Sequence, residues 1–108
     1  MSTKKQSSGF ITYVKRHRQV RSWNLAELAR RAGLSQPEVS RLESGVRMPT
    51  MRHVKGLAEA FSGAPTGQVG EPRRYEDWLA MLVDYAERSR QDTYASRKDV
   101  VQETAAGA

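Results

Sequence analysis

Two short helix-forming segments joined at a glycine constrain this chain more than any other feature. The stretch LAELARRAGLSQPEVSRLES contains both of them. Asn24 and Ser35 are each followed, three places on, by a glutamate, which is the pattern of a capping box at the start of a helix. Gly33 can take the left-handed backbone conformation that ends a helix. The pattern predicts helices over residues 24–32 and 35–44, joined by a tight turn.

Small and apolar residues of this stretch fall on one side of the two predicted helices. Ala29 occupies the place where two short helices must touch if they are to cross. The other residues predicted to face inward are Leu28, Ala32, Leu34, Val39 and Leu42. This geometry is that of a helix-turn-helix, in which the second helix protrudes far enough to enter the major groove of DNA.

The rest of the chain predicts further helices and no strands. Apolar residues recur at helical spacing over residues 10–20, 51–61 and 75–90. We therefore expect an all-α fold of four to five helices. The predicted divisions are an N-terminal arm at 1–8, a helix-turn-helix domain at 9–62, a Gly- and Pro-rich linker at 63–74, a C-terminal amphipathic helix at 75–95 and a tail at 96–108.

Several classes of protein are excluded by what the sequence lacks. Without cysteine there is no disulfide scaffold, thiol nucleophile or cysteine-based zinc site. The two histidines lack the spacing of metal ligands, so no metal or other cofactor is expected. There is no nucleophile–base pair or carboxylate pair at a useful spacing, so the chain is not expected to be an enzyme. It has neither a secretory signal pattern nor an apolar run long enough to span a membrane, which favours a cytoplasmic location.

Basic charge is concentrated in the first part of the chain. The sequence holds 18 Lys and Arg against 12 Asp and Glu, a net charge of +6. Residues 1–24 carry six basic side chains and no acid, whereas residues 62–108 carry six basic and eight acidic ones. Such asymmetry favours a polyanionic partner, of which nucleic acid is the commonest, although a solubilising basic surface would give the same count.

The helix-turn-helix and its surroundings resemble the Cro/C1-type family, also called XRE-like, of phage and bacterial repressors. The matching residues are Leu28, Ala29, Gly33, Leu34, Val39 and Leu42 in the motif, Glu43-Ser44-Gly45 at its end, and Arg47-Met48-Pro49-Thr50 in the loop that follows. The resemblance covers residues 10–62. It implies a compact lambda-repressor-like fold. It also implies a sequence-specific transcriptional regulator, generally a repressor, that binds double-stranded DNA as a homodimer.

The resemblance assigns roles to individual residues. It implies base contacts from Ser35, Gln36, Pro37, Ser40 and Arg41. It implies phosphate contacts from Asn24 and Ser44, and a structural ion pair between Arg18 and Glu43. Arg47 and Arg52 flank the loop that follows the motif and are expected to contact phosphate as well. Gln36 suits adenine and Arg41 suits guanine, because each side chain can bond two atoms on the major-groove edge of that base.

The C-terminal part of the chain leaves alternatives open. Its apolar stripe consists of Trp78, Met81, Leu82 and Tyr85. This stripe can pack on its own domain, pair with a second copy, or do both. Residues 63–108 can instead hold a toxin, which would make the chain the antitoxin of a toxin–antitoxin pair. An interaction module that has lost DNA binding is a third interpretation.

Five residues outside the motif receive structural interpretations. Trp23, Met51 and Phe61 are predicted to be core residues. His17 and His53 are predicted to lie at the partly exposed surface.

Overall fold

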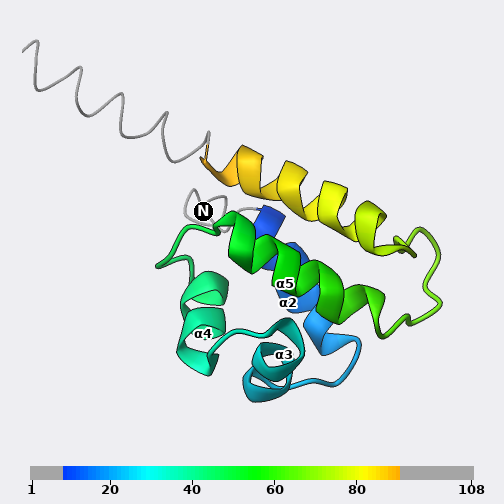
Figure 1. Ribbon diagram of the computed structural model, residues 1–108, viewed down its shortest axis with the longest axis horizontal. Helices are drawn as coiled ribbons and strands as arrows, with labels where there is room; N and C mark the ends of the chain where they lie inside the picture. The colour runs from blue at the N-terminus through cyan, green and yellow to red at the C-terminus, as the bar shows by residue number, and fades with distance from the viewer. Residues whose placement is uncertain (1–8, 91–108) are drawn as a thin grey trace, which may run out of the picture.

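The computed structural model describes residues 9–90, which form an all-α fold. Its helices are α2 (Gly9–Gln19), α3 (Leu25–Ala32), α4 (Gln36–Ser44), α5 (Met51–Ser62) and a fifth over residues 75–90 (Figure 1). There are no strands in this part of the chain, and none of these helices is long and apolar enough to cross a membrane. The predicted arm at 1–8, the end of the predicted C-terminal helix at 91–95 and the tail at 96–108 lie outside the described residues.

The turn between α3 and α4 is fixed by its capping groups. Ser35 Oγ accepts a hydrogen bond from the backbone N–H of Glu38 at 3.2 Å, and Glu38 Oε1 accepts one from the backbone N–H of Ser35 at 3.0 Å. This is the capping box that the sequence predicts. Gly33 ends α3 with a φ of 69°, a conformation that side chains with a β-carbon rarely adopt. Local chemistry therefore sets where α3 ends and α4 begins.

The start of α3 differs from its prediction. Asn24 caps the helix as expected, because its Oδ1 accepts from the backbone N–H of Glu27 at 2.8 Å. The Glu27 carboxylate was expected to reach back to the cap, but it binds Arg30 and Arg31, each at 2.6 Å. Charged donors one turn further along the helix offer stronger hydrogen bonds than a single backbone N–H. Consequently α3 has only half of a capping box.

The hydrophobic core is shared by all five helices. Its largest fully buried side chains include Trp78, Phe10, Phe61, Leu28, Leu57 and Leu82. The residues predicted to face inward in the motif, Leu28, Ala29, Ala32, Leu34, Val39 and Leu42, are each 9% exposed or less. At Gly56 a β-carbon would collide with the carbonyl oxygen of Ala32, so α5 packs directly on the end of α3.

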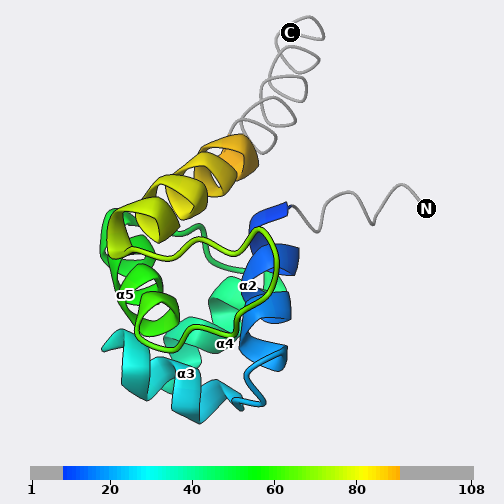
Figure 2. The same cartoon turned by 90° about the vertical axis from the view of Figure 1, so that its right-hand side faces the viewer.

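The helix over residues 75–90 completes this core. It lies along α5, on the side away from α3 (Figures 1 and 2). Trp78 and Leu82 are fully buried, and the Trp78 ring meets the rings of His17 and Phe61 at centroid distances of 4.9 and 5.1 Å. Three of the four residues in the predicted stripe therefore pack within their own chain, because Tyr85 also packs against the core, with its ring 4.6 Å from that of Tyr13. Tyr85 is half-buried and Met81 is exposed.

Three of the structural interpretations were wrong. Met51 was expected in the core but is 51% exposed, because it lies on the solvent side of the first turn of α5. His17 and His53 were expected at the surface but are only 6% and 1% exposed. His17 follows Phe10 and Val14 at helical spacing and shares their buried face. The His53 ring turns inward to cap its own helix, with Nδ1 accepting from the Thr50 backbone N–H at 3.0 Å.

A buried ion pair holds the loop at 63–74 against the end of α2. Arg21 Nη2 lies 2.7 Å from Glu71 Oε2, and both side chains are 4% exposed. The Arg21 guanidinium also donates to three backbone carbonyl oxygens. Glu71 Oε1 accepts from Thr66 Oγ1 at 2.6 Å and from the backbone N–H of Gly67 at 3.1 Å. The segment predicted as a linker is thus a folded loop.

Candidate nucleic-acid interface

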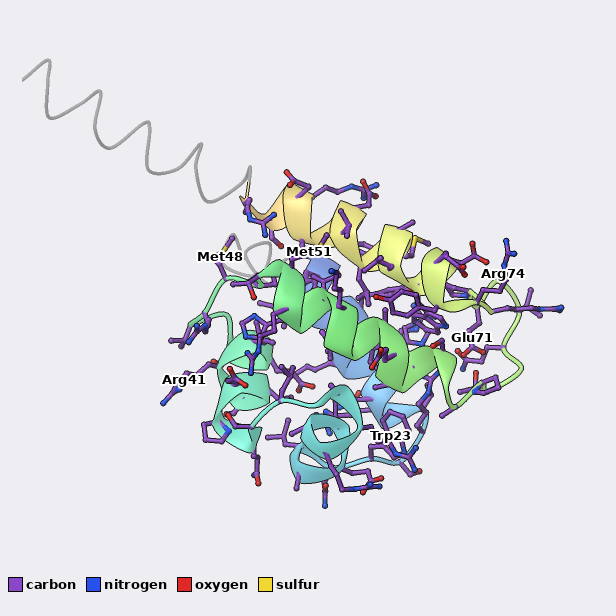
Figure 3. All side chains as sticks on the ribbon, in the orientation of Figure 1. Trp23, Arg41, Met48, Met51, Glu71 and Arg74 are labelled. Atoms are coloured by element: carbon purple, nitrogen blue, oxygen red, sulfur yellow. The ribbon has the colours of Figure 1, made fainter. Side chains whose placement is uncertain are left out.

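One face of α4 lies in the core and the opposite face is open to solvent. Val39 and Leu42 anchor the helix with exposed fractions of 0% and 2%. Figure 3 shows Arg41 pointing outward from α4, away from the other helices. The five residues predicted to contact bases are all exposed: Ser35, Gln36, Pro37, Ser40 and Arg41.

The polar side chains on this exposed face make few hydrogen bonds within the protein. Within residues 9–90, no hydrogen bond or ion pair engages the side chains of Gln36, Arg41 or Arg47. Ser35 differs, because its hydroxyl is occupied by the capping box. Gln36 and Arg41 therefore keep all their donors and acceptors available for an incoming ligand, which base reading requires.

The residues predicted to contact phosphate lie at the edges of the motif. Asn24 stands at the start of α3, with its oxygen engaged as the helix cap. Ser44 is exposed at the end of α4, and its hydroxyl donates to the backbone carbonyl of Arg41 at 3.2 Å. Arg47 is exposed in the loop between α4 and α5. Arg52 is also exposed, but its guanidinium binds Glu38 at 2.8 Å.

A bidentate ion pair joins the end of α4 to α2. Arg18 Nε lies 2.7 Å from Glu43 Oε2, and Arg18 Nη2 lies 2.9 Å from Glu43 Oε1. The side chains are 14% and 5% exposed. The remaining guanidinium nitrogen of Arg18 donates to the backbone carbonyl of Trp23 at 2.9 Å. Because both bonds of the pair are parallel and shielded, the geometry fixes the orientation of α4 as well as its position.

A second charged cluster joins the start of α4 to α5. Hydrogen bonds from Arg52, and then from the backbone N–H of Ser35, lower the pKa of Glu38 to about 2. The Nε2 atom of buried His53 lies 3.7 Å from Glu38 Oε2. The sequence pattern indicates Glu38 only as half of a capping box. No local pattern signals its partners on α5, because they lie in a different helix.

The basic charge at the start of the chain is partly internal. Arg18 and Arg21 are held in the ion pairs described above, so they do not add to a surface for a polyanion. Lys15 and Arg16 are exposed, while Lys4 and Lys5 lie outside the described residues. The charge count alone therefore overstated how much of α2 can face DNA.

The two histidines have internal roles. Burial, and then the neighbouring guanidinium of Arg21, lower the pKa of His17 to about 4. Burial likewise lowers the pKa of His53. Both rings are therefore neutral at pH 7. In the part of the chain that the structure describes, no group of three or more His, Cys, Asp or Glu side chains is placed to hold a metal ion.

Comparison with known proteins agrees with this geometry. Two short helices joined by a tight glycine turn, the second with its outer face open to solvent, form the arrangement of the helix-turn-helix class. The helix-turn-helix family of Cro/C1 type matches residues 14–66, which run from within α2 to the loop after α5, so the chain carries a helix-turn-helix domain of this family. It is a DNA-binding transcription regulator. Neither the curated proteins nor the solved structures give a match.

Proposed function

We propose that this regulator is sequence-specific and acts as a repressor, reading the major groove with α4. One observation carries the proposal. Gln36 and Arg41 are exposed and have no side-chain partner in residues 9–90, on a helix whose other face is anchored by Val39 and Leu42. A helix held in this way can enter a groove without unfolding any part of the domain.

The proposed mechanism separates attraction from reading. Exposed basic residues such as Arg47 draw the protein to DNA and release counterions, independently of sequence. Arg41 then bonds O6 and N7 of guanine, and Gln36 bonds N6 and N7 of adenine. Each such bidentate contact discriminates against a wrong base by about 1–3 kcal/mol. Pro37 has no donor and offers only apolar contact, for example to a thymine methyl group.

We further propose that two copies bind together, in the cytoplasm, to a pseudo-palindromic operator. One α4 spans only a few base pairs, which gives one copy little selectivity. Helix-turn-helix dimers read half-sites whose centres lie about one helical turn, roughly 34–36 Å, apart. The half-site spacing of the operator therefore reports on the geometry of the dimer.

Selection from random duplex DNA tests this proposal. The purified protein is mixed with a random library at a fixed salt concentration, and the bound sequences are recovered and read. We expect enrichment of a palindrome with half-sites one helical turn apart. An enriched single half-site would keep the reading of bases and overturn the dimer. Absence of any enriched sequence would overturn the proposed function.

The antitoxin alternative has one observation in its favour. The helix over residues 75–90 carries the exposed carboxylate of Glu76, which has no ion pair within residues 9–90 and suits a basic partner. Against it, the apolar residues Trp78 and Leu82 are already used by the chain's own core. Within the described part of this segment, a toxin would therefore have to bind the outer face of the helix, where Met81 is exposed. Co-expression with the product of a neighbouring gene, followed by co-purification, would favour the antitoxin if a stable complex formed.

A further inference from the structure

The two ends of α4 are tethered by charged side chains from two different helices. At its C-terminal end, Glu43 binds Arg18 of α2. At its N-terminal end, Glu38 binds Arg52 of α5, with Nη1 2.8 Å from Oε2. The first tether matches the ion pair that the family resemblance implies. The second was not expected, and it lies in the same helical turn as Gln36.

Glu38 brings three groups together at this point. Its Oε1 accepts from the backbone N–H of Ser35, which closes the capping box. Its Oε2 accepts from Arg52 and faces Nε2 of His53 at 3.7 Å. The Glu38 side chain is only 18% exposed, so its carboxylate points along the protein surface toward α5 rather than into solvent. One carboxylate thus connects the cap of α4 to the first turn of α5.

His53 contributes a buried dipole aimed at this carboxylate. Its Nδ1 accepts from the Thr50 backbone N–H, so the proton of the neutral ring is on Nε2. Within residues 9–90, Nε2 has no hydrogen-bond partner, although the side chain is 1% exposed. The attraction between this N–H and Glu38 is electrostatic at 3.7 Å, since that separation is too long for a hydrogen bond.

We propose that Glu38 is a positioning residue for base reading. Through Arg52 and His53 it fixes the first turn of α4 to α5, and so sets the angle at which Gln36 and Pro37 meet the bases. This inference rests on the proposed function. The inference adds to the proposed function a residue that controls specificity without touching DNA.

The position of Glu38, Arg52 and His53 implies that their contacts affect discrimination between DNA sequences more than the stability of the fold. The Arg52 side chain is 61% exposed, so solvent and salt screen its pairing with Glu38. Bidentate base contacts, however, tolerate displacements of only about 0.5 Å and rotations of roughly 10–20°. Attraction to phosphate is not directional to the same degree. A loosened first turn should therefore lose base contacts while keeping non-specific binding.

The test compares Glu38→Ala with Glu27→Ala. Glu27 occupies the same third helical position in α3 and also binds arginines, but only within its own helix. Dissociation constants are measured for the selected duplex and for a scrambled duplex at one salt concentration. Each variant removes one negative charge, so both should bind scrambled DNA slightly more tightly. We expect the specificity ratio to fall about tenfold in Glu38→Ala, equivalent to one base contact, and to stay unchanged in Glu27→Ala.

Two further variants identify the tether itself. Glu38→Gln keeps a side chain that can complete a capping box but loses the charge, and should give an intermediate ratio. Arg52→Ala should lower the ratio as Glu38→Ala does, and the two changes combined should cost little more than either alone. If Arg52 only contacted phosphate, its removal would weaken binding to both duplexes equally and leave the ratio unchanged.

The outcomes separate this inference from the function on which it rests. A wild-type protein without a preferred sequence overturns both. A specific wild-type protein whose ratio is unaffected by Glu38→Ala and Arg52→Ala overturns only the positioning role. A lower melting temperature with equal losses on both duplexes would show a merely structural role and would also overturn it. If Glu38→Ala fails to fold, Arg52→Ala decides, because it leaves the capping box intact.

Discussion

At the scale of single residues, two arginines near the end of α4 carry the same charge but have different surroundings. Arg41 projects from the solvent-exposed face of α4, whereas Arg47 lies in the loop that follows α4. Neither guanidinium has a partner among residues 9–90. Their different positions, and not their charge, lead us to assign base reading to the first and phosphate binding to the second.

Alanine at each position should therefore have a different effect. Arg41→Ala should cost about 1–3 kcal/mol on the preferred sequence and relax the preference at one base pair. Arg47→Ala should weaken binding to all sequences alike and reduce the slope of log K against log salt by about 1. Fluorescence anisotropy with preferred and scrambled duplexes, over a range of salt concentrations, measures both. Identical behaviour of the two variants would contradict this division of roles.

A second residue-scale prediction concerns His17 and pH. The pKa of His17 is lowered from 6.5 to about 4 in the folded protein. Between these values the unfolded chain binds a proton that the folded protein does not, so the free energy of unfolding falls as pH falls through this window. We expect His17→Phe, which cannot titrate, to lose less stability than the wild type between pH 7 and pH 5. The buried His53 should account for part of the stability that the variant still loses.

Urea denaturation at the two pH values measures this difference. The two pH values lie above the ordinary glutamate pKa of 4.5, and both proteins contain Glu38 and Glu71, so the protonation of these carboxylates does not produce a difference between them. If the two proteins lost the same stability on acidification, the account of His17 as a buried neutral ring would be wrong.

At the scale of helices, the sequence predicted what local chemistry controls. The caps at Asn24 and Ser35 and the end of α3 at Gly33 follow from residues within a few places of each other. Contacts between distant segments were not predictable in this way. Arg21 and Glu71 are separated by 50 residues, and nothing in either neighbourhood indicates the other. The same holds for Glu38 and Arg52.

Glu43→Gln tests the tether at the C-terminal end of α4. The substitution leaves the charge of Arg18 without its counter-ion in a largely buried position, where breaking an ion pair costs about 3–5 kcal/mol. We expect the free energy of unfolding to fall by roughly 3 kcal/mol, since glutamine keeps one acceptor. Thermal and urea denaturation provide the measurement. The control is Glu59→Gln on the exposed face of α5; a similar change in both variants, or none in either, would contradict the role of the pair.

At the scale of the whole molecule, the helix over residues 75–90 is part of the core that supports the DNA-reading surface. An apolar stripe in the sequence predicted that this helix buries one face, but not against which partner, because a second copy would give the same pattern. In the structure, Trp78 packs on the rings of His17 and Phe61, which joins this helix to α2 and α5. Its outer face, with Met81 38% exposed, is left for solvent or a partner.

Trp78→Ala should therefore destabilise the protein itself. Removing a fully buried tryptophan costs about 3–5 kcal/mol through lost burial and the cavity left behind. Met81→Ala, on the exposed face of the same helix, should cost less than about 1 kcal/mol. Denaturation measures stability, and sedimentation equilibrium over a range of concentrations measures the mass of each variant. Trp78→Ala with unchanged stability and unchanged mass would contradict both packing in the core and pairing with a second copy.

The most direct test of major-groove reading by α4 uses modified DNA. Each purine of the selected duplex is replaced in turn by its 7-deaza analogue, which lacks the N7 acceptor that both Arg41 and Gln36 are proposed to bond. We expect at least one 7-deazaguanine to weaken wild-type binding about tenfold and to have no effect on Arg41→Ala. Wild-type binding that is indifferent to every replacement, or an Arg41→Ala variant as sensitive as the wild type, would contradict base reading by α4.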